Sequence, residues 1–178
     1  MTREKMTKRD PGKPAKTGST VASILAQWRA ARPDLDCRPM AVIGQLWRTS
    51  QIAMRAVEAN LKTYDLDMAG FDVLLTLRRQ GGEQGPENAL TPGDLARDMM
   101  MSPPAMTNRI DRLVVRGLVE RHADPDDRRA LRVALTGEGR ALADKAVETH
   151  LAVEEELLQA LSRAERDQLA SLLARIGR

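Results

Sequence analysis

Asparagine, arginine, serine and threonine side chains gather on one face of residues 102–117. Asparagine and arginine match the major-groove edges of adenine and guanine, and hydroxyl groups suit phosphates. The opposite face is apolar at helical spacing, which predicts an amphipathic helix. Its expected buried residues are Met106, Ile110, Leu113 and Val114. The residues expected to contact double-stranded DNA are Ser102, Pro104, Thr107, Asn108, Arg109 and Arg112. The alternative is a polar face that meets only water, as in most amphipathic helices.

A second set of candidate residues lies in the charged turn "DPDDRR" at residues 124–129. An arginine at such a turn can enter the narrow minor groove of a duplex, where the negative potential is favourable. We expect Arg128 to make this insertion. Arg129 is expected to pair with Asp126 or Asp127 and to stiffen the turn. The alternative is that these charges only pair with one another in solvent, which contributes little to stability.

The segments on both sides of this turn predict an antiparallel hairpin. In "ALRVALT" apolar and other residues alternate, with Leu131, Val133 and Leu135 expected on the buried face. The preceding run "GLVERH" is a second short extended segment after Gly117. The charged turn therefore forms the exposed tip of the hairpin.

Two helix starts precede the hairpin. Thr91, Pro92 and Asp94 supply an N-cap, a first-turn proline and an acid, and Ser102-Pro103 repeats the signal eleven residues later. Two short helices joined by a tight turn make a helix-turn-helix. Followed by the hairpin, they predict a winged helix-turn-helix whose second helix enters the major groove. Use of the same module for protein association without DNA is the competing hypothesis.

Helical periodicity continues on both sides of this module. The expected fold is mainly α with a small β-hairpin wing, assembled as a homodimer through N- and C-terminal helices that space the two reading helices. A closed monomeric bundle is the alternative. The expected parts are a disordered basic tail (1–18), N-terminal helices (19–62), the winged helix-turn-helix (63–136) and C-terminal dimerisation helices (137–178).

Composition excludes several classes of protein. The net charge of +3 is concentrated in residues 1–17, which carry +4 and leave −1 for the rest, so it is no argument for nucleic-acid binding. Two histidines, one cysteine and the absence of "HExxH", "GxSxG" and P-loop motifs argue against an enzyme, a metal site or a bound cofactor. No apolar run reaches membrane-spanning length, and no secretion signal is evident, so a cytoplasmic protein without a membrane partner is expected.

The combined pattern resembles the MarR family of bacterial transcription regulators over about residues 39–176. The resemblance rests on "LTPGDLARDMMMSPPAMTNRIDRLVVRGLVER" followed by "DPDDRRALRVALTGEGRAL". It implies a homodimer on palindromic DNA that usually represses a nearby promoter. Release by a small ligand or by oxidation is also implied.

A finer resemblance is to the family members that respond to urate and related purines. It rests on an additional N-terminal helix with Trp28 and on Asp72, Arg79 and Arg121, which implies that these residues bind a small anionic effector. Asp72 and Arg79 also lie two helical turns apart, about 10 Å along one helix face. The alternatives are that Trp28 anchors a core and that Asp72 and Arg79 form an ion pair.

Cys37 suggests a competing signal for release from DNA, namely oxidation of its thiol. It lies near the start of the first long helix, where the peroxide-sensing members of the family carry a cysteine, and Arg38 would favour its thiolate. Two further expectations concern packing. The run Met99–Met101 is expected to fill the core between the short helices, and His150 to lie on a helix surface.

Overall fold

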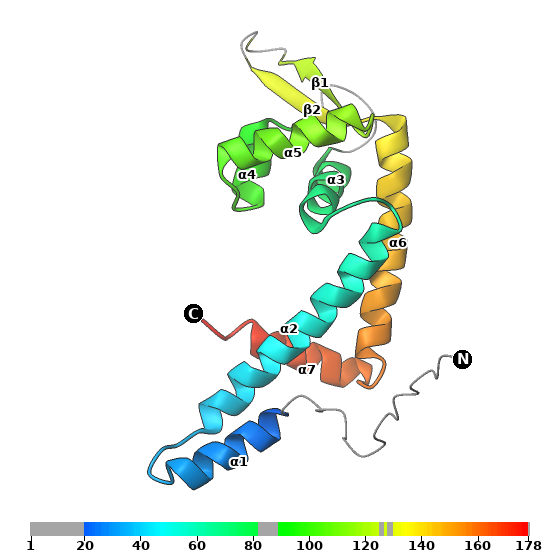
Figure 1. Cartoon of the computed structure of the whole chain (residues 1–178). Helices are drawn as coiled ribbons and strands as arrows, with labels where there is room; N and C mark the ends of the chain where they lie inside the picture. The colour runs from blue at the N-terminus through cyan, green and yellow to red at the C-terminus, as the bar shows by residue number, and fades with distance from the viewer. Residues whose placement is uncertain (1–19, 82–88, 125–126, 128–129, 178) are drawn as a thin grey trace, which may run out of the picture. The chain divides into compact units, whose positions relative to one another are not determined.

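The computed structural model describes residues 20–81, 89–124, 127 and 130–177 (Figure 1). The expected basic tail and both wing-tip arginines, Arg128 and Arg129, therefore lie outside the described residues. The chain divides into two compact units, Met1–Gln51 and Ile52–Arg178, and each is treated by itself.

The first unit contains α1 (Val21–Ala31) and the beginning of α2 (Arg38–Lys62). The predicted additional N-terminal helix is thus present. It starts where the Thr20 hydroxyl accepts a hydrogen bond from the Ser23 amide at 3.1 Å. None of the residues of α1 is buried, and Trp28 is 40% exposed.

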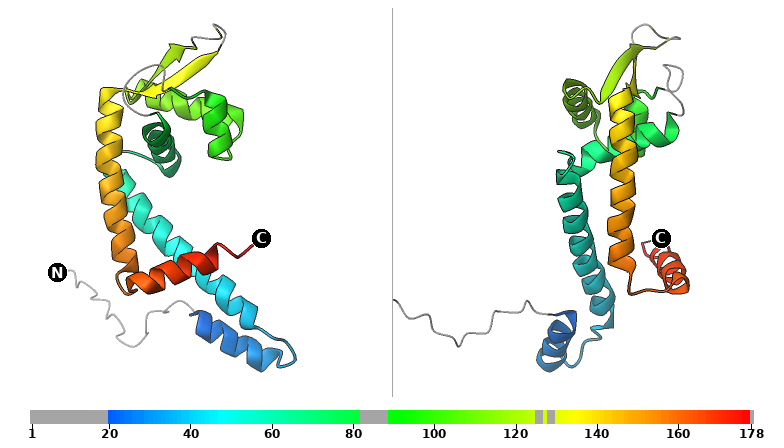
Figure 2. Two further views of the ribbon diagram at one scale, coloured as in Figure 1. Left: turned by 180° about the vertical axis from the view of Figure 1, so that it is seen from behind. Right: turned by 90° about the vertical axis from the view of Figure 1, so that its right-hand side faces the viewer.

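The second unit contains the predicted module, a helix-turn-helix followed by a hairpin. Its elements are α3 (Met68–Gln80), α4 (Pro92–Asp98), α5 (Pro103–Val115), β1 (Val119–Ala123), β2 (Leu131–Leu135), α6 (Gly137–Leu158) and α7 (Arg163–Leu173). Thr91 caps α4 through a reciprocal capping box with Asp94, as the sequence predicts. Figure 2 shows α6 running away from the wing and turning into α7 at its far end.

The wing is the predicted antiparallel hairpin, and the structure gives its register. Val119 lies opposite Leu135, and Ala123 lies opposite Leu131. Leu90 extends the pairing, since its amide and carbonyl each bond to Val133 at 3.0 and 2.8 Å. Val133 is fully buried in the apolar core, whereas Leu131 is 48% exposed and was wrongly expected on the buried face. Leu131 lies close to the hairpin tip, beyond the helices that cover Val133.

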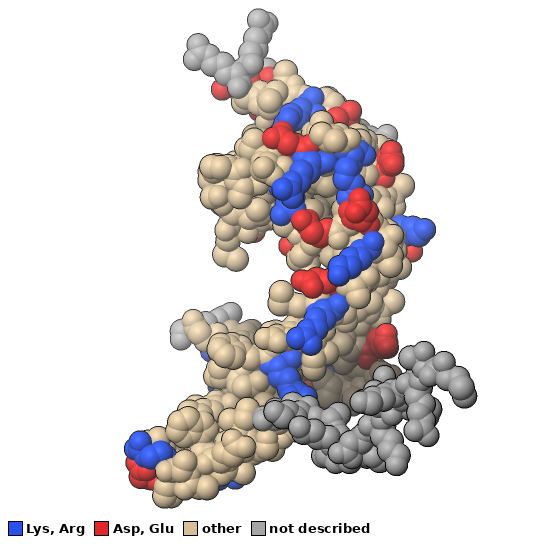
Figure 3. Space-filling view, viewed as in Figure 1, with Lys and Arg blue, Asp and Glu red and all other residues tan. Residues whose placement is uncertain are grey.

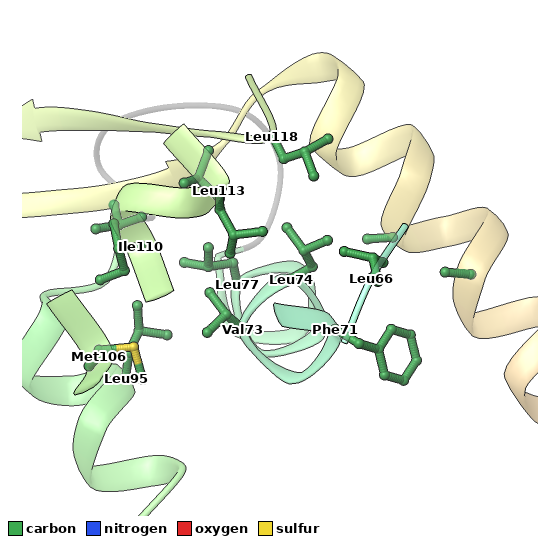
Figure 4. Packing of buried hydrophobic residues seen from close by; sticks show 14 of the residues in the cluster. Leu66, Phe71, Val73, Leu74, Leu77, Leu95, Met106, Ile110, Leu113 and Leu118 are labelled. Atoms are coloured by element: carbon green, nitrogen blue, oxygen red, sulfur yellow. The ribbon is translucent and has the colours of Figure 1, made fainter. Parts of the chain in front are cut away.

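A single apolar cluster holds α3, α5, the wing and α6 together (Figure 4). The buried residues predicted on α5 are confirmed for Met106, Ile110 and Leu113, while Val114 is only partly buried. The largest fully buried side chains are those of Leu61, Phe71, Leu74, Leu95, Met106 and Ile110. This core fixes α5 against the rest of the domain, so its polar face has a defined direction.

The methionine run is only partly core. Met99 and Met101 pack against the cluster, but Met100 is 95% exposed and adopts a left-handed backbone with φ of 51°. The prediction was wrong for Met100 because the turn between α4 and α5 reverses the chain there and directs its side chain outward. Within the described ranges, no helix is both long and apolar enough to cross a bilayer.

Candidate nucleic-acid interface

The exposed face of α5 carries Ser102, Pro104, Thr107 and Asn108, as the sequence predicts. Ser102 is the N-cap residue, but its side chain makes no capping hydrogen bond, so its hydroxyl is available to a phosphate. The Thr107 hydroxyl instead donates to the Pro103 carbonyl at 3.1 Å. Asn108 projects an amide that is not held by any described residue. These groups form the core of the candidate interface.

The Arg109 side chain does not point outward with the other polar side chains of α5. Its guanidinium pairs with Asp67 at the start of α3, and its side chain is only 20% exposed. Position 109 lies three residues after Met106 and four before Leu113, so it borders the buried stripe. Contact of Arg109 with a base would require this ion pair to open.

Asp67 both caps α3 and pairs with Arg109. Its carboxylate caps α3 by accepting from the Gly70 amide at 2.8 Å and also pairs with Arg109. Partial burial alone would raise the pKa of Asp67, but the Gly70 hydrogen bond and the charges of Arg109 and Arg112 bring it below its usual value. Asp67 therefore stays ionised at neutral pH, as its ion pair with Arg109 requires.

The wing is braced by a residue that the sequence reading did not single out. Asp124 is 7% exposed and accepts from Arg132 at 2.7 Å and from the Asp127 amide at 3.3 Å. The expected bracing by Arg129 lies outside the described residues. An aspartate that directly follows a strand and precedes a proline was the available signal, because such residues often bond to the following turn.

Asp72 and Arg79, expected to bind a ligand, come together in a cavity of about 310 Å³. Leu75, Thr76, Asp98, Met99 and Met100 complete its lining. In the described part of the chain Asp72 and Arg79 form no ion pair with each other, so the simple pairing alternative is not seen. Burial raises the pKa of Asp72, with His150 and Arg79 acting in the opposite direction.

The other two members of the expected ligand set are placed differently. Arg121 donates to Asp111 of α5 at 2.5 Å and does not line this cavity. Trp28 belongs to the first unit, and its 40% exposure argues against a role as a core anchor. Their participation in ligand binding stays a prediction.

His150 lies beside Asp72 rather than on a helix surface, which corrects the sequence expectation. Its ring centroid is 5.0 Å from that of Phe71, and its Nε2 atom lies 3.1 Å from Glu154. Its side chain is only 17% exposed. The buried positions Ala143 and Ala146 precede it at helical spacing, so the periodicity of α6 contained the signal.

Replacing Asp72 by asparagine should raise the thermal midpoint at pH 7 slightly, because partial burial disfavours the ionised carboxylate and raises the pKa of Asp72. A carboxyl group whose pKa is raised by folding stabilises the protein while protonated and loses this contribution as pH rises through its folded pKa. The thermal midpoint of the variant, relative to that of the wild type, should therefore rise between about pH 4 and pH 7. Thermal melts at the two pH values measure this, and a lower midpoint for Asp72→Asn at pH 7 would contradict it.

Cys37, the competing trigger, is buried at 6% exposure. Its sulfur lies 3.8 Å from the Leu35 carbonyl, and the neighbouring Arg38 pairs with Asp36 at 2.7 Å. The cation that was expected to assist the thiolate is thus engaged elsewhere. Burial also restricts the access of an oxidant to the thiol.

A helix-turn-helix with an exposed polar second helix and an adjoining wing places the chain among winged helix-turn-helix proteins. Residues 64–130 match the MarR family model. The chain is 38% identical over 156 residues to the HTH-type transcriptional regulator PecS of Dickeya dadantii. The aligned region covers 88% of this chain and 92% of PecS. The chain therefore belongs to the MarR family of DNA-binding transcriptional regulators.

Solved structures of relatives agree with this fold. A mutant of MarR from E. coli, solved in complex with operator DNA, aligns with a TM-score of 0.65 and 26% identity over 85% of this chain and 98% of that chain. BpsR of Bordetella bronchiseptica, whose DNA binding is regulated by 6-hydroxynicotinic acid, aligns with a TM-score of 0.64 and 29% identity, covering 76% of this chain and 91% of BpsR. These relatives are DNA-binding regulators rather than enzymes.

Proposed function

We propose that the protein is a ligand-responsive repressor that binds a palindromic operator as a homodimer. The observation that carries the proposal is the exposed polar face of α5, fixed by the core beside the wing. The operator complex of the E. coli relative supports the DNA partner. Wing-tip contact through Arg128, in a turn stiffened by Arg129, remains part of the proposal.

A homodimer is favoured by apolar side chains that the chain itself leaves uncovered. Within the second unit, these are Leu151, Leu157, Leu158, Leu169, Leu172, Leu173 and Ile176 of α6, α7 and the residues after α7. Within the first unit, Ile43 is 48% and Trp47 71% exposed. Exposed apolar surface of this extent is typical of an interface. A second copy of the chain would cover it and set the distance between two α5 helices.

Asn108→Ala should weaken operator binding by about 30- to 10⁴-fold, because the dimer carries two Asn108 side chains and each bidentate contact to a base contributes about 1–3 kcal/mol. Affinity for non-operator DNA should remain as in the wild type, because phosphate contacts are retained. Fluorescence anisotropy with both duplexes measures the two affinities. An equal loss on both duplexes would contradict base reading by Asn108.

The proposed effector is a small organic anion such as urate or a related purine. The cavity that holds Asp72 and Arg79 offers a guanidinium that is exposed at its wall and makes no ion pair with a described residue. Guanidinium groups recognise planar anions through paired hydrogen bonds and stacking. The regulation of BpsR by an aromatic acid supports this ligand class.

Titration with urate, xanthine and benzoate tests the ligand assignment. Urate or xanthine should release the operator and change the fluorescence of a Trp47→Phe variant, in which Trp28 is the remaining tryptophan. Arg79→Gln should lose the release while keeping operator affinity. Arg78→Gln is the matched control, because Arg78 pairs with Asp144 at 2.6 Å and does not line the cavity. Release by neither purine would remove the ligand assignment and leave DNA binding intact.

A further inference from the structure

We propose that a backbone phosphate of DNA binds in a basic pocket formed by the end of α2, the start of α3 and the outer flank of α5. This inference rests on the proposed DNA contact of α5; it assigns Arg112, already expected to contact DNA, to a backbone phosphate and adds Lys62 of α2 as its partner. The pocket has a volume of about 350 Å³ and lies entirely within the second unit. Its charged lining residues are Lys62, Asp65, Asp67, Arg109, Arg112 and Arg116.

Two of the four cations are held in place by the pocket itself. Arg109 pairs with Asp67. Arg116 donates to the main-chain carbonyls of Tyr64, at 3.1 Å, and of Asp65. Carbonyl oxygens orient a guanidinium without neutralising its charge. The Asp65 carboxylate lies 3.8 Å from Arg116 with its side chain 97% exposed, so water weakens that attraction.

The other two cations, Lys62 and Arg112, have no direct partner among the described residues. Both are exposed, and neither makes a hydrogen bond or an ion pair with a residue in the described ranges. The four cations outnumber the two carboxylates, which leaves an excess of two positive charges in the pocket. Figure 3 shows Lys and Arg side chains gathered over α5 and the adjoining part of α2, with acidic groups between them. The pocket therefore attracts an anion.

The position of Arg112 indicates which anion. Arg112 follows the reading residue Asn108 by one helical turn, so the mouth of the pocket borders the DNA-facing side of α5. A helix with its side chains is about 10–12 Å wide, and the major groove is about 12 Å wide. Side chains on the flanks of a helix in this groove consequently lie against the phosphates of its walls. Lys62 and Arg112 hold one such phosphate, and Arg116 adds its fixed positive charge to the same pocket.

The salt dependence of DNA binding tests this inference with the full-length dimer. Each phosphate neutralised contributes about −0.9 to the slope of log K against log salt. Because a dimer has two pockets, Lys62→Ala combined with Arg112→Ala should reduce the slope by about 2 in magnitude. Operator and non-operator DNA should be affected equally, in contrast to Asn108→Ala. Thermal melting should show an unchanged fold, since both residues are exposed and unpaired.

Arg55→Ala is the matched control, because Arg55 lies two turns before Lys62 on α2, is exposed, and does not line the pocket. Its slope should equal that of the wild type. An unchanged slope in the double variant would overturn the inference while leaving the proposed function standing. The pocket could instead bind a free anion, which calorimetry with inorganic phosphate and with benzoate measures. If the wild type binds either anion and the double variant keeps the DNA slope of the wild type, the pocket is a site for a free anion. That result would equally overturn the inference.

Discussion

Gly139→Ala should destabilise the second unit by about 3 kcal/mol or more, which is a large part of the stability of a domain of this size. A Cβ atom at position 139 would lie 1.8 Å from the Leu118 carbonyl oxygen and 2.8 Å from its carbonyl carbon. These are main-chain atoms, so no side-chain rotation relieves the overlap. The start of α6 would have to move away from the beginning of β1.

That movement would also break the junction between the reading helix and α6. The Thr136 hydroxyl donates to the Gly117 carbonyl at 2.6 Å and accepts from the Gly139 amide at 3.0 Å. The Thr136 amide bonds to the Leu118 carbonyl at 3.2 Å. We therefore expect loss of DNA binding together with loss of stability.

Urea denaturation of Gly139→Ala beside Gly93→Ala measures the effect with a matched control. A Cβ atom at Gly93 would meet only the Thr91 hydroxyl, at an ordinary 3.6 Å. Because alanine has a higher helix propensity than glycine, Gly93→Ala should be neutral or stabilise α4 by up to about 1 kcal/mol. Equal midpoints for the two variants would contradict the close approach at Gly139.

Leu172→Glu should convert the proposed dimer to monomers and lower operator affinity by about 10²- to 10⁴-fold. Of the residues of α7, none is buried, although Leu169, Leu172 and Leu173 make one side of it apolar. A carboxylate in the centre of that face would be buried without a partner in the dimer. Each half-site would then be bound singly, without the gain from a linked second site.

Ser171→Glu is the control, since Ser171 is exposed and lies about 100° or more from the apolar residues around α7. Light scattering after size-exclusion chromatography should give a dimer mass for the wild type and for Ser171→Glu, and a monomer mass for Leu172→Glu. A dimeric Leu172→Glu with undiminished operator affinity would place the interface elsewhere.

The parts of the fold that depend on neighbours in the sequence were predictable. Asp67, Thr91 and Ser162 cap their helices through contacts three residues away, and aspartate, threonine and serine are the residue types preferred at N-cap positions. The two strands of the wing likewise follow from apolar alternation, although Leu131 is exposed at the end of β2. Local hydrogen-bonding rules and apolar periodicity were sufficient for these elements.

The features that the sequence did not predict depend on contacts between distant segments. Arg109 meets Asp67 from 42 residues away, and periodicity could not distinguish the edge of the polar face from its centre. His150 is enclosed because α6 packs on α3, where Phe71 meets its ring. The bracing of the wing depends on the contact of Asp124 with Arg132, eight residues further along the chain. These contacts decide which charged groups remain free for DNA.

Footprinting on the DNA that flanks the gene, combined with the mass of the protein–DNA complex, tests the central claim most directly. Two copies of the chain, each presenting α5 to a major groove, should protect two half-sites related by two-fold symmetry, with centres about 10 base pairs apart or a multiple of that spacing. The complex should contain two chains per site. Protection of one asymmetric half-site by a single chain would contradict the account.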